Sequence, residues 1–159
     1  MPSPPEPSED NDYLAGHVQL LCDSLRRVTQ RDLINPALHG VEAAKALFIA
    51  PFVVLSHNTD ADPIFNYANR TALDLFELTW TQLTTLPSRQ SAEPPNQNER
   101  ARLLAEVTTS GFIDNYSGIR ISRSGRRFLI TRATVWNLVD AMGNHQGQAA
   151  TFSEWEFLE

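Results

Sequence analysis

Residues 62–78, DPIFNYANRTALDLFEL, contain the change of period that decides the fold. The first half is typical of a short strand and the second of a helix, with apolar side chains at Ile64, Phe65 and Tyr67 and then at Leu73 and Phe76. Asn69 stands at the break, where its side-chain oxygen can cap the helix. Such a junction can present a nucleophile, bind a phosphate or close one side of a ligand-sized pocket. The surrounding residues must decide between these roles.

Length and composition limit the classes of protein to consider. The 159 residues suit one domain with a short extension, and 42% hydrophobic and 9% aromatic residues are normal for a globular protein. A net charge of −6 argues against a dedicated nucleic-acid binder, and no apolar run approaches the roughly 18 residues of a membrane helix. The single cysteine, Cys22, and an N-terminus unlike a signal peptide lead us to expect a cytoplasmic protein.

The segment before the junction is expected to be helical after a disordered tail. Residues 1–12 are rich in proline and acidic groups, which predicts disorder. Residues 13–50 form a predicted N-terminal helical extension, whose second helix starts at Asn35-Pro36 and ends before Pro51. The first helix has an apolar seam spaced 4, 3, 4, 3, formed by Leu14, Val18, Leu21, Leu25 and Val28. This seam either packs on its own domain or forms a homodimer.

Residues 51–159 are predicted to form one α+β domain. Two strands, at 52–55 and 63–67, precede the helices, and residues 87–98 are expected to be a loop. Asn96 and Glu99 form a capping box for a helix that stops at Gly111. Three long strands then follow, the last of them over 146–157. This order predicts a five-stranded antiparallel sheet with helices on one face.

The same residues resemble a PAS domain. In PIFNYANRTALDLFELTWTQLTTLP, residues 63–87, the matching positions are Tyr67, Asn69, Ala72 and Leu83. More specifically, residues 45–158 are similar to the MEKHLA domain, a PAS-related module. This resemblance is carried by DPIFNYANRTALDLFEL, the PSRQSAEP loop, ATVWNL around Trp136 and the terminal FSEWEFL. It implies a PAS-like fold with a sensory or protein-interaction role, in which the Asn69 junction is architecture that walls a pocket.

A pocket between sheet and helices is the expected binding site for a small molecule. We expect its wall to include Leu55, Phe65, Phe76, Val107, Phe128 and Trp136, with polar groups at His57, Tyr67 and Arg89. No cofactor is identified by the sequence. The resemblance implies that covalent flavin photochemistry is excluded, because residues 86–93 hold no cysteine, whereas non-covalent flavin binding stays open. The expected function is therefore non-catalytic, and a homodimer or a protein partner would receive the signal, without nucleic acid or membrane.

An enzyme acting on a small anionic substrate is the alternative function. Arg89 would clamp the substrate, and His57 or Glu93 would act as acid and base, provided that these groups converge in one cleft. A metal site at His57, Asp60 and Asp62 is not favoured, because the spacing fits no standard calcium loop and a polar turn explains it.

Two further clusters lie on the C-terminal strands. The arginines of the predicted hairpin are expected to form a solvated strand face, at Arg120, Arg123, Arg126, Arg127 and Arg132. The aromatic residues Trp136, Trp155 and Phe157 form either core or an interaction surface. A bulge near Arg132 would change which face these side chains occupy.

Overall fold

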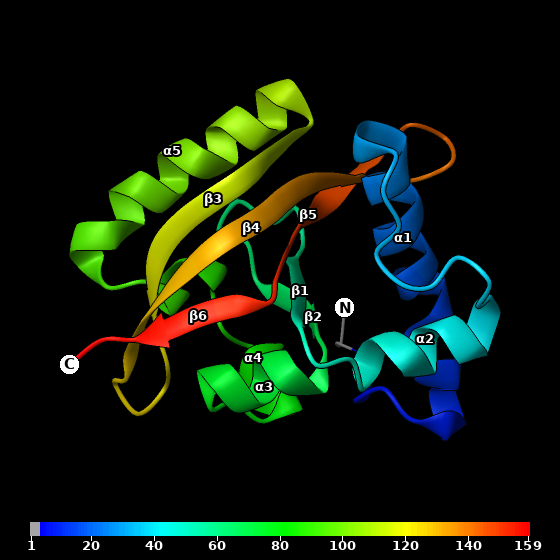
Figure 1. Cartoon of the computed structure of the whole chain (residues 1–159), viewed down its shortest axis with the longest axis horizontal. Coiled ribbons are helices and arrows are strands. Elements are labelled where there is room, and N and C mark those ends of the chain that lie inside the picture. Colours follow the sequence, from blue (N-terminus) through cyan, green and yellow to red (C-terminus); the bar gives the residue numbers. More distant parts are fainter. Residues whose placement is uncertain (1–3) are drawn as a thin grey trace.

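The strand and helix periods of the sequence fold into one antiparallel sheet with helices on both faces, seen in the computed structural model, which describes residues 4–159 (Figure 1). The helical elements are η1 (Glu9–Leu14), α1 (Ala15–Thr29), α2 (Gly40–Phe48), α3 (Arg70–Phe76), α4 (Trp80–Leu83), η2 (Ser88–Ser91) and α5 (Pro94–Ser110). The strands are β1 (Val53–His57), β2 (Phe65–Ala68), β3 (Phe112–Ile121), β4 (Arg127–Val139), β5 (His145–Phe152) and β6 (Glu154–Phe157). Within this described part, none of the helices combines the length and apolar character needed to pass through a lipid bilayer.

The strand order within residues 4–159 is β2-β1-β5-β4-β3, and every neighbouring pair is antiparallel. The predicted antiparallel sheet is confirmed, with one difference at its end. The predicted strand over 146–157 breaks at Ser153 into β5 and β6. β5 pairs with the second half of β4, and β6 pairs with residues 128–131 of the first half, so the sheet gains a sixth strand.

The bulge considered near Arg132 is present. Arg132 has a φ of 54° and Asn115, on the neighbouring strand, a φ of 55°, and the register of β3 with β4 shifts in this region. A bulge inserts an unpaired residue and so changes the alternation of side chains between the two faces. As a result Ile130 and Val135 line the same side of the sheet, although five positions separate them.

Asn69 joins three elements at the junction. Its side chain is fully buried, and its Oδ1 accepts hydrogen bonds from the amides of Val54 and Ala72, each at 3.1 Å. Its Nδ2 donates to the carbonyls of Leu47 and Phe52 at 3.1 and 2.7 Å. The end of α2, the start of β1 and the first turn of α3 are therefore held by one amide.

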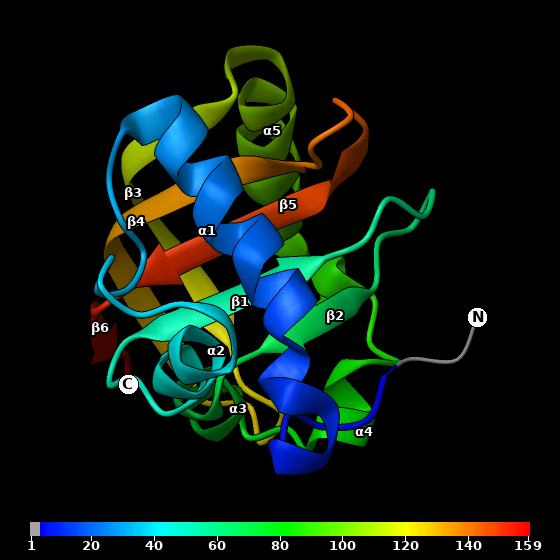
Figure 2. The same ribbon diagram turned by 90° about the vertical axis from the view of Figure 1, so that its right-hand side faces the viewer.

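The predicted N-terminal helix packs on its own domain. Figure 2 shows α1 lying across one face of the sheet, with α5 behind the opposite face. Val18, Leu21 and Leu25 are buried, and the Leu21 carbonyl accepts a hydrogen bond from Nε1 of Trp136 at 3.2 Å. Ser24 also bonds to the carbonyl and amide of Val139. The apolar seam is thus used within the chain.

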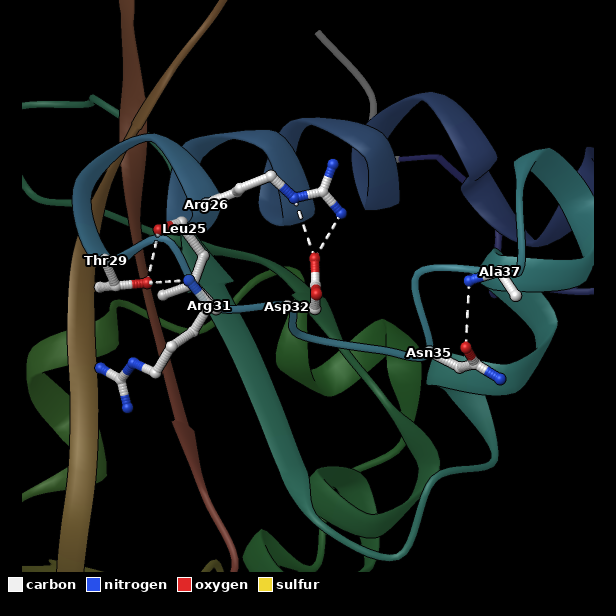
Figure 3. Close-up of polar contacts among 7 residues, drawn as sticks. All are labelled: Leu25, Arg26, Thr29, Arg31, Asp32, Asn35 and Ala37. Atoms are coloured by element: carbon white, nitrogen blue, oxygen red, sulfur yellow. Dashed lines mark hydrogen bonds and ion pairs between the residues drawn. The ribbon is translucent and has the colours of Figure 1, made fainter.

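The connection from α1 to α2 is fixed by short-range polar contacts (Figure 3). Arg26 pairs with Asp32, with 2.9 Å between Nε and Oδ1, and the Thr29 hydroxyl donates to the Leu25 carbonyl. Asn35 does not start a helix, which corrects the prediction. Its Oδ1 accepts from the amide of Ala37, as in an Asx turn, and α2 begins only at Gly40, where φ is 56°.

Two further segments differ from the expectation. The prediction that a helix begins at Asn96 is wrong, because α5 begins at Pro94, next to Glu93, with prolines in its first turn. Proline suits that position because no amide partner is needed there. The tail predicted over residues 1–12 is also partly regular, since η1 starts at Glu9, and residues 1–3 lie outside the described residues.

Candidate functional site

A small cavity lies between the sheet and α5. Its volume is about 50 Å³, and its apolar wall comes from β1, β2, α3 and β4 through Leu55, Phe65, Phe76, Ile130 and Val135. About 10–15 Å³ of such volume holds one water molecule. The cavity therefore has room for a group of a few heavy atoms, well below the roughly 300 Å³ of a site for a large cofactor.

His57 places an unpartnered nitrogen at this cavity. It ends β1, is 7% exposed, and its Nδ1 lies 2.9 Å from the carbonyl of Asn58. A carbonyl can only accept, so Nδ1 carries the proton and Nε2 presents a lone pair. Nε2 has no hydrogen-bond partner within the described part of the chain.

The charge state of His57 follows from its surroundings. Burial lowers the pKa of His57, and the nearby cation of Arg100 lowers it further. The Asn58 carbonyl raises the pKa of His57. Gln148 also raises this pKa, although it forms no hydrogen bond with Nε2. Because burial is the largest cause, the imidazole is neutral near pH 7 and its Nε2 is an acceptor.

Arg100 is the most unusual residue at the cavity. It lies on the buried face of α5 with Leu103 and Val107 and is only 9% exposed. Among the described residues, its guanidinium has no hydrogen bond and no ion pair. Burial lowers the pKa of Arg100 to about 10, and the nearby cation of Arg120 contributes to this shift.

Arg120 is the second buried cation at the cavity, with 6% of its surface exposed. Its Nη1 donates to the carbonyl of Ile119 at 2.8 Å, and its Nη2 to the hydroxyl of Tyr116 at 3.2 Å. That hydroxyl donates in turn to Glu99 at 2.8 Å. Gly118 leaves room for this arrangement, because a Cβ there would collide with the Tyr116 ring.

Gln148 fixes α5 to the sheet beside the cavity. Its Nε2 lies 3.1 Å from the carbonyl of Leu104, 3.0 Å from the hydroxyl of Thr108 and 3.0 Å from Oδ1 of Asn137. Asn137 also donates to the carbonyl of Val107 at 2.9 Å. This network holds the helix that carries Arg100 at a defined distance from the strands.

The structure brings together only part of the predicted site. His57 and Phe65 line the cavity, whereas Phe128 lies beside it, with its ring 5.2 Å from that of Phe76. Tyr67 and Trp136 are buried on the opposite face, under α1. Their positions correct the expectation of one shared pocket, and strand alternation across the bulge is the reason.

Arg89 and Glu93 also lie away from the cavity. Nε of Arg89 is 3.1 Å from Asp62 on the surface, and Glu93 pairs with Arg127 at 3.0 Å. The groups of the alternative enzyme, which also needed His57, therefore do not converge in one cleft. The structure gives them separate partners instead.

The two charged residues of the cavity wall, Arg100 and Arg120, were not predicted as site residues. Arg120 was expected on a solvated strand face, and this expectation is wrong because it is buried opposite Phe128. Arg100 has a signal in the sequence, since helical spacing places it on the same face as Leu103 and Val107. The aromatic residues of the C-terminal strands divide between core and surface. Trp136 is part of the core, whereas Phe157 is 42% exposed and lies under the guanidinium of Arg126.

Comparisons with known proteins agree with this architecture. Residues 15–157 match the model of the MEKHLA domain. The homeobox-leucine zipper protein ATHB-9 of Arabidopsis thaliana is 28% identical over 103 residues, which are 65% of this chain and 12% of that protein. The chain thus spans only a small part of this curated relative.

Solved structures show the same fold. A PAS domain from Colwellia psychrerythraea superposes with a TM-score of 0.59 at 13% identity, over 68% of this chain and 89% of that one. A light-oxygen-voltage domain studied with a flavin analogue gives a TM-score of 0.58 at 15% identity, over 73% and 84% of the two chains. The predicted PAS-like fold and the family resemblance are confirmed: this chain belongs to the MEKHLA domain family.

Proposed function

We propose that this protein is a non-catalytic, PAS-like sensory module. A small ligand binds in the cavity between the sheet and α5, and its presence changes how α1 packs on the opposite face. A second copy of the chain or a protein partner then reads the position of α1. The observation that carries this proposal is that neighbouring residues of the same strands contact the cavity on one side and α1 on the other.

The first of these pairs lies on β1. His57 lines the cavity, while Ser56 faces α1, and its hydroxyl lies 2.9 Å from Nε2 of His17. The Ser56 hydroxyl donates to Asn66 at 2.6 Å, so His17 is the donor in its own contact with Ser56. A movement of His57 toward a ligand would therefore change a hydrogen bond of α1 directly.

The second pair lies on β4. Val135 lines the cavity, and the next residue, Trp136, donates its indole N–H to the Leu21 carbonyl of α1. A ligand can shift the packing of α1 only by as much as it favours one arrangement over the other. Release of α1 would free its apolar seam, whose spacing suits pairing with the same helix of a second chain.

The proposal is tested by native mass spectrometry of the purified protein beside spectra recorded after denaturation. Extra mass lost on denaturation supports a retained small molecule and gives its mass. Amide hydrogen exchange of α1 is then compared with and without that ligand, with α3 as the internal control. A protein that retains no molecule, and whose α1 exchanges equally fast with every compound that binds the cavity, would refute the sensory role.

A further inference from the structure

The cavity contains buried positive charge that no acidic side chain of its wall balances. Arg100 and Arg120 both line it, and the described lining residues include no aspartate or glutamate. Glu99 contacts Tyr116 rather than either guanidinium. Burying a charge without an opposite charge beside it costs several kcal/mol in general. Arg100 has no partner among the described residues, and Arg120 bonds only to neutral groups, so a small anion in the cavity would stabilise both.

Several arginines elsewhere in the described part of the chain have acidic partners on the surface. Arg127 pairs with Glu93 at 3.0 Å, and Arg132 lies 3.6 Å from Glu154. Both pairs are on the surface, where a partner contributes little. At the cavity, where a partner would contribute much more, Arg100 has none among the described side chains. The missing partner is therefore expected to come from outside the protein.

The other groups of the cavity restrict the chemistry of that partner. His57 offers a lone pair on Nε2, which a hydroxyl of the ligand can satisfy by donating to it. Phe76 and Ile130 offer apolar surface. A volume of about 50 Å³ admits only a few heavy atoms. Inorganic anions would satisfy the arginines but leave the apolar wall without contacts.

We propose that the cavity binds a short-chain hydroxycarboxylate of about two or three carbons, a size set by the cavity volume. Its carboxylate accepts hydrogen bonds from Arg100 and Arg120, its hydroxyl donates to His57, and its carbon chain lies against the apolar wall. Planar guanidinium groups match the geometry of a carboxylate, which favours this group over a halide. This inference rests on the proposed function and names the class of molecule that is sensed.

The test is isothermal titration calorimetry, in which the full chain is titrated with sodium salts at constant ionic strength. The probes are 2-hydroxypropanoate, propanoate, phosphate and chloride. We expect saturable binding of 2-hydroxypropanoate and roughly tenfold weaker binding of propanoate, since one hydrogen bond to a buried acceptor contributes about one factor of ten. Phosphate binding as tightly as 2-hydroxypropanoate, or no binding of either carboxylate, would overturn the assignment.

Variants separate recognition from folding. Arg100→Met should abolish binding while the protein stays folded and becomes equally or more resistant to urea, because an unpaired buried charge is replaced by an apolar chain. Arg102→Met is the matched control, since Arg102 lies exposed on the same helix and its loss should change neither property. Arg100→Lys keeps the charge but should weaken binding at least tenfold. Unchanged binding in Arg100→Met overturns the proposal.

His57→Leu tests the role of the hydroxyl. It should bring the affinity for 2-hydroxypropanoate down to that for propanoate and leave the latter nearly unchanged. Equal discrimination in the wild type and the variant would remove His57 from the assignment. If native mass spectra reveal a retained molecule that is not a carboxylate, the ligand class is wrong while the sensory function stands.

Discussion

Replacing Asn69 with alanine should be among the most destabilising single changes in the described part of the chain. The side chain is 0% exposed and makes four hydrogen bonds, all to backbone groups: one each in α2, β1 and α3, and one at Phe52 just before β1. Alanine leaves two buried amides and two buried carbonyls without this partner. Each such bond contributes about 1 kcal/mol, so the loss should be about 4 kcal/mol. That is a large share of the stability of an ordinary domain.

The assay is equilibrium unfolding in urea, followed by tryptophan fluorescence. The midpoint should fall with little change in slope, because the slope reflects the surface exposed on unfolding. Asn98→Ala is the control. Asn98 is exposed on α5, and its side chain has no hydrogen bond within residues 4–159, so its loss should change the free energy of unfolding by less than about 0.5 kcal/mol. A loss below about 1.5 kcal/mol for Asn69→Ala would refute the view that one amide joins the three elements.

Asn69→Asp refines the same prediction. Aspartate caps a helix as well as asparagine and keeps both acceptor bonds, but it cannot donate to the Leu47 and Phe52 carbonyls. Burial beside two carbonyl oxygens raises the pKa of this new carboxyl in the folded state. Its protonated form is thus favoured by folding, and the variant should recover stability as the pH falls through that raised pKa. A pH-independent difference from wild type would contradict this account.

Three further predictions concern the sheet and the helix α1 that packs on it. Trp136→Phe removes the indole bond to α1 and should lower stability by about 1–2 kcal/mol and speed hydrogen exchange in α1. Gly147→Ala should lower the free energy of unfolding in urea by at least about 2 kcal/mol, because φ is 138° and a Cβ would collide with the His57 carbonyl. Gly143→Ala is the control and should lower it by less, because Gly143 has a φ of 86° but lies in open space. Burial lowers the pKa of His17 from 6.5 to about 4. The contribution of neutral His17 to stability is therefore complete above pH 6.5 and is lost as the pH falls toward 4, by roughly 3 kcal/mol, and His17→Gln should flatten this pH dependence.

The fold could be predicted because its signals are local. The change of period at residues 62–78, the capping by Asn69 and the alternation in the last strands each depend on neighbours in sequence. The wrong predictions concern the first residues of helices, where the same residue type can either begin a helix or close a turn. Asn35 closes a turn with Ala37 instead of capping a helix, and Pro94 starts α5 two positions before the expected cap.

The candidate site was harder to predict because burial of charge is decided by tertiary packing. Arg120 lies in a strand rich in polar residues, and only the approach of α5 turns its side chain into part of the cavity. Arg89 looked equally suitable, yet it reaches Asp62 on the surface. Sequence alone does not distinguish a cation that finds an acidic partner from one that does not.

The bulge at Arg132 explains why both faces of this sheet are built as they are. Without the extra residue, alternation from Ile130 would place Val135 under α1 and Trp136 toward α5, because a slip of one position exchanges every side chain between faces. The cavity would then be filled by an indole, and α1 would lose its bond from Trp136. The bulge at Arg132 thus keeps the cavity open and places the indole of Trp136 beneath α1. The proposed link between ligand binding in the cavity and the packing of α1 requires this arrangement.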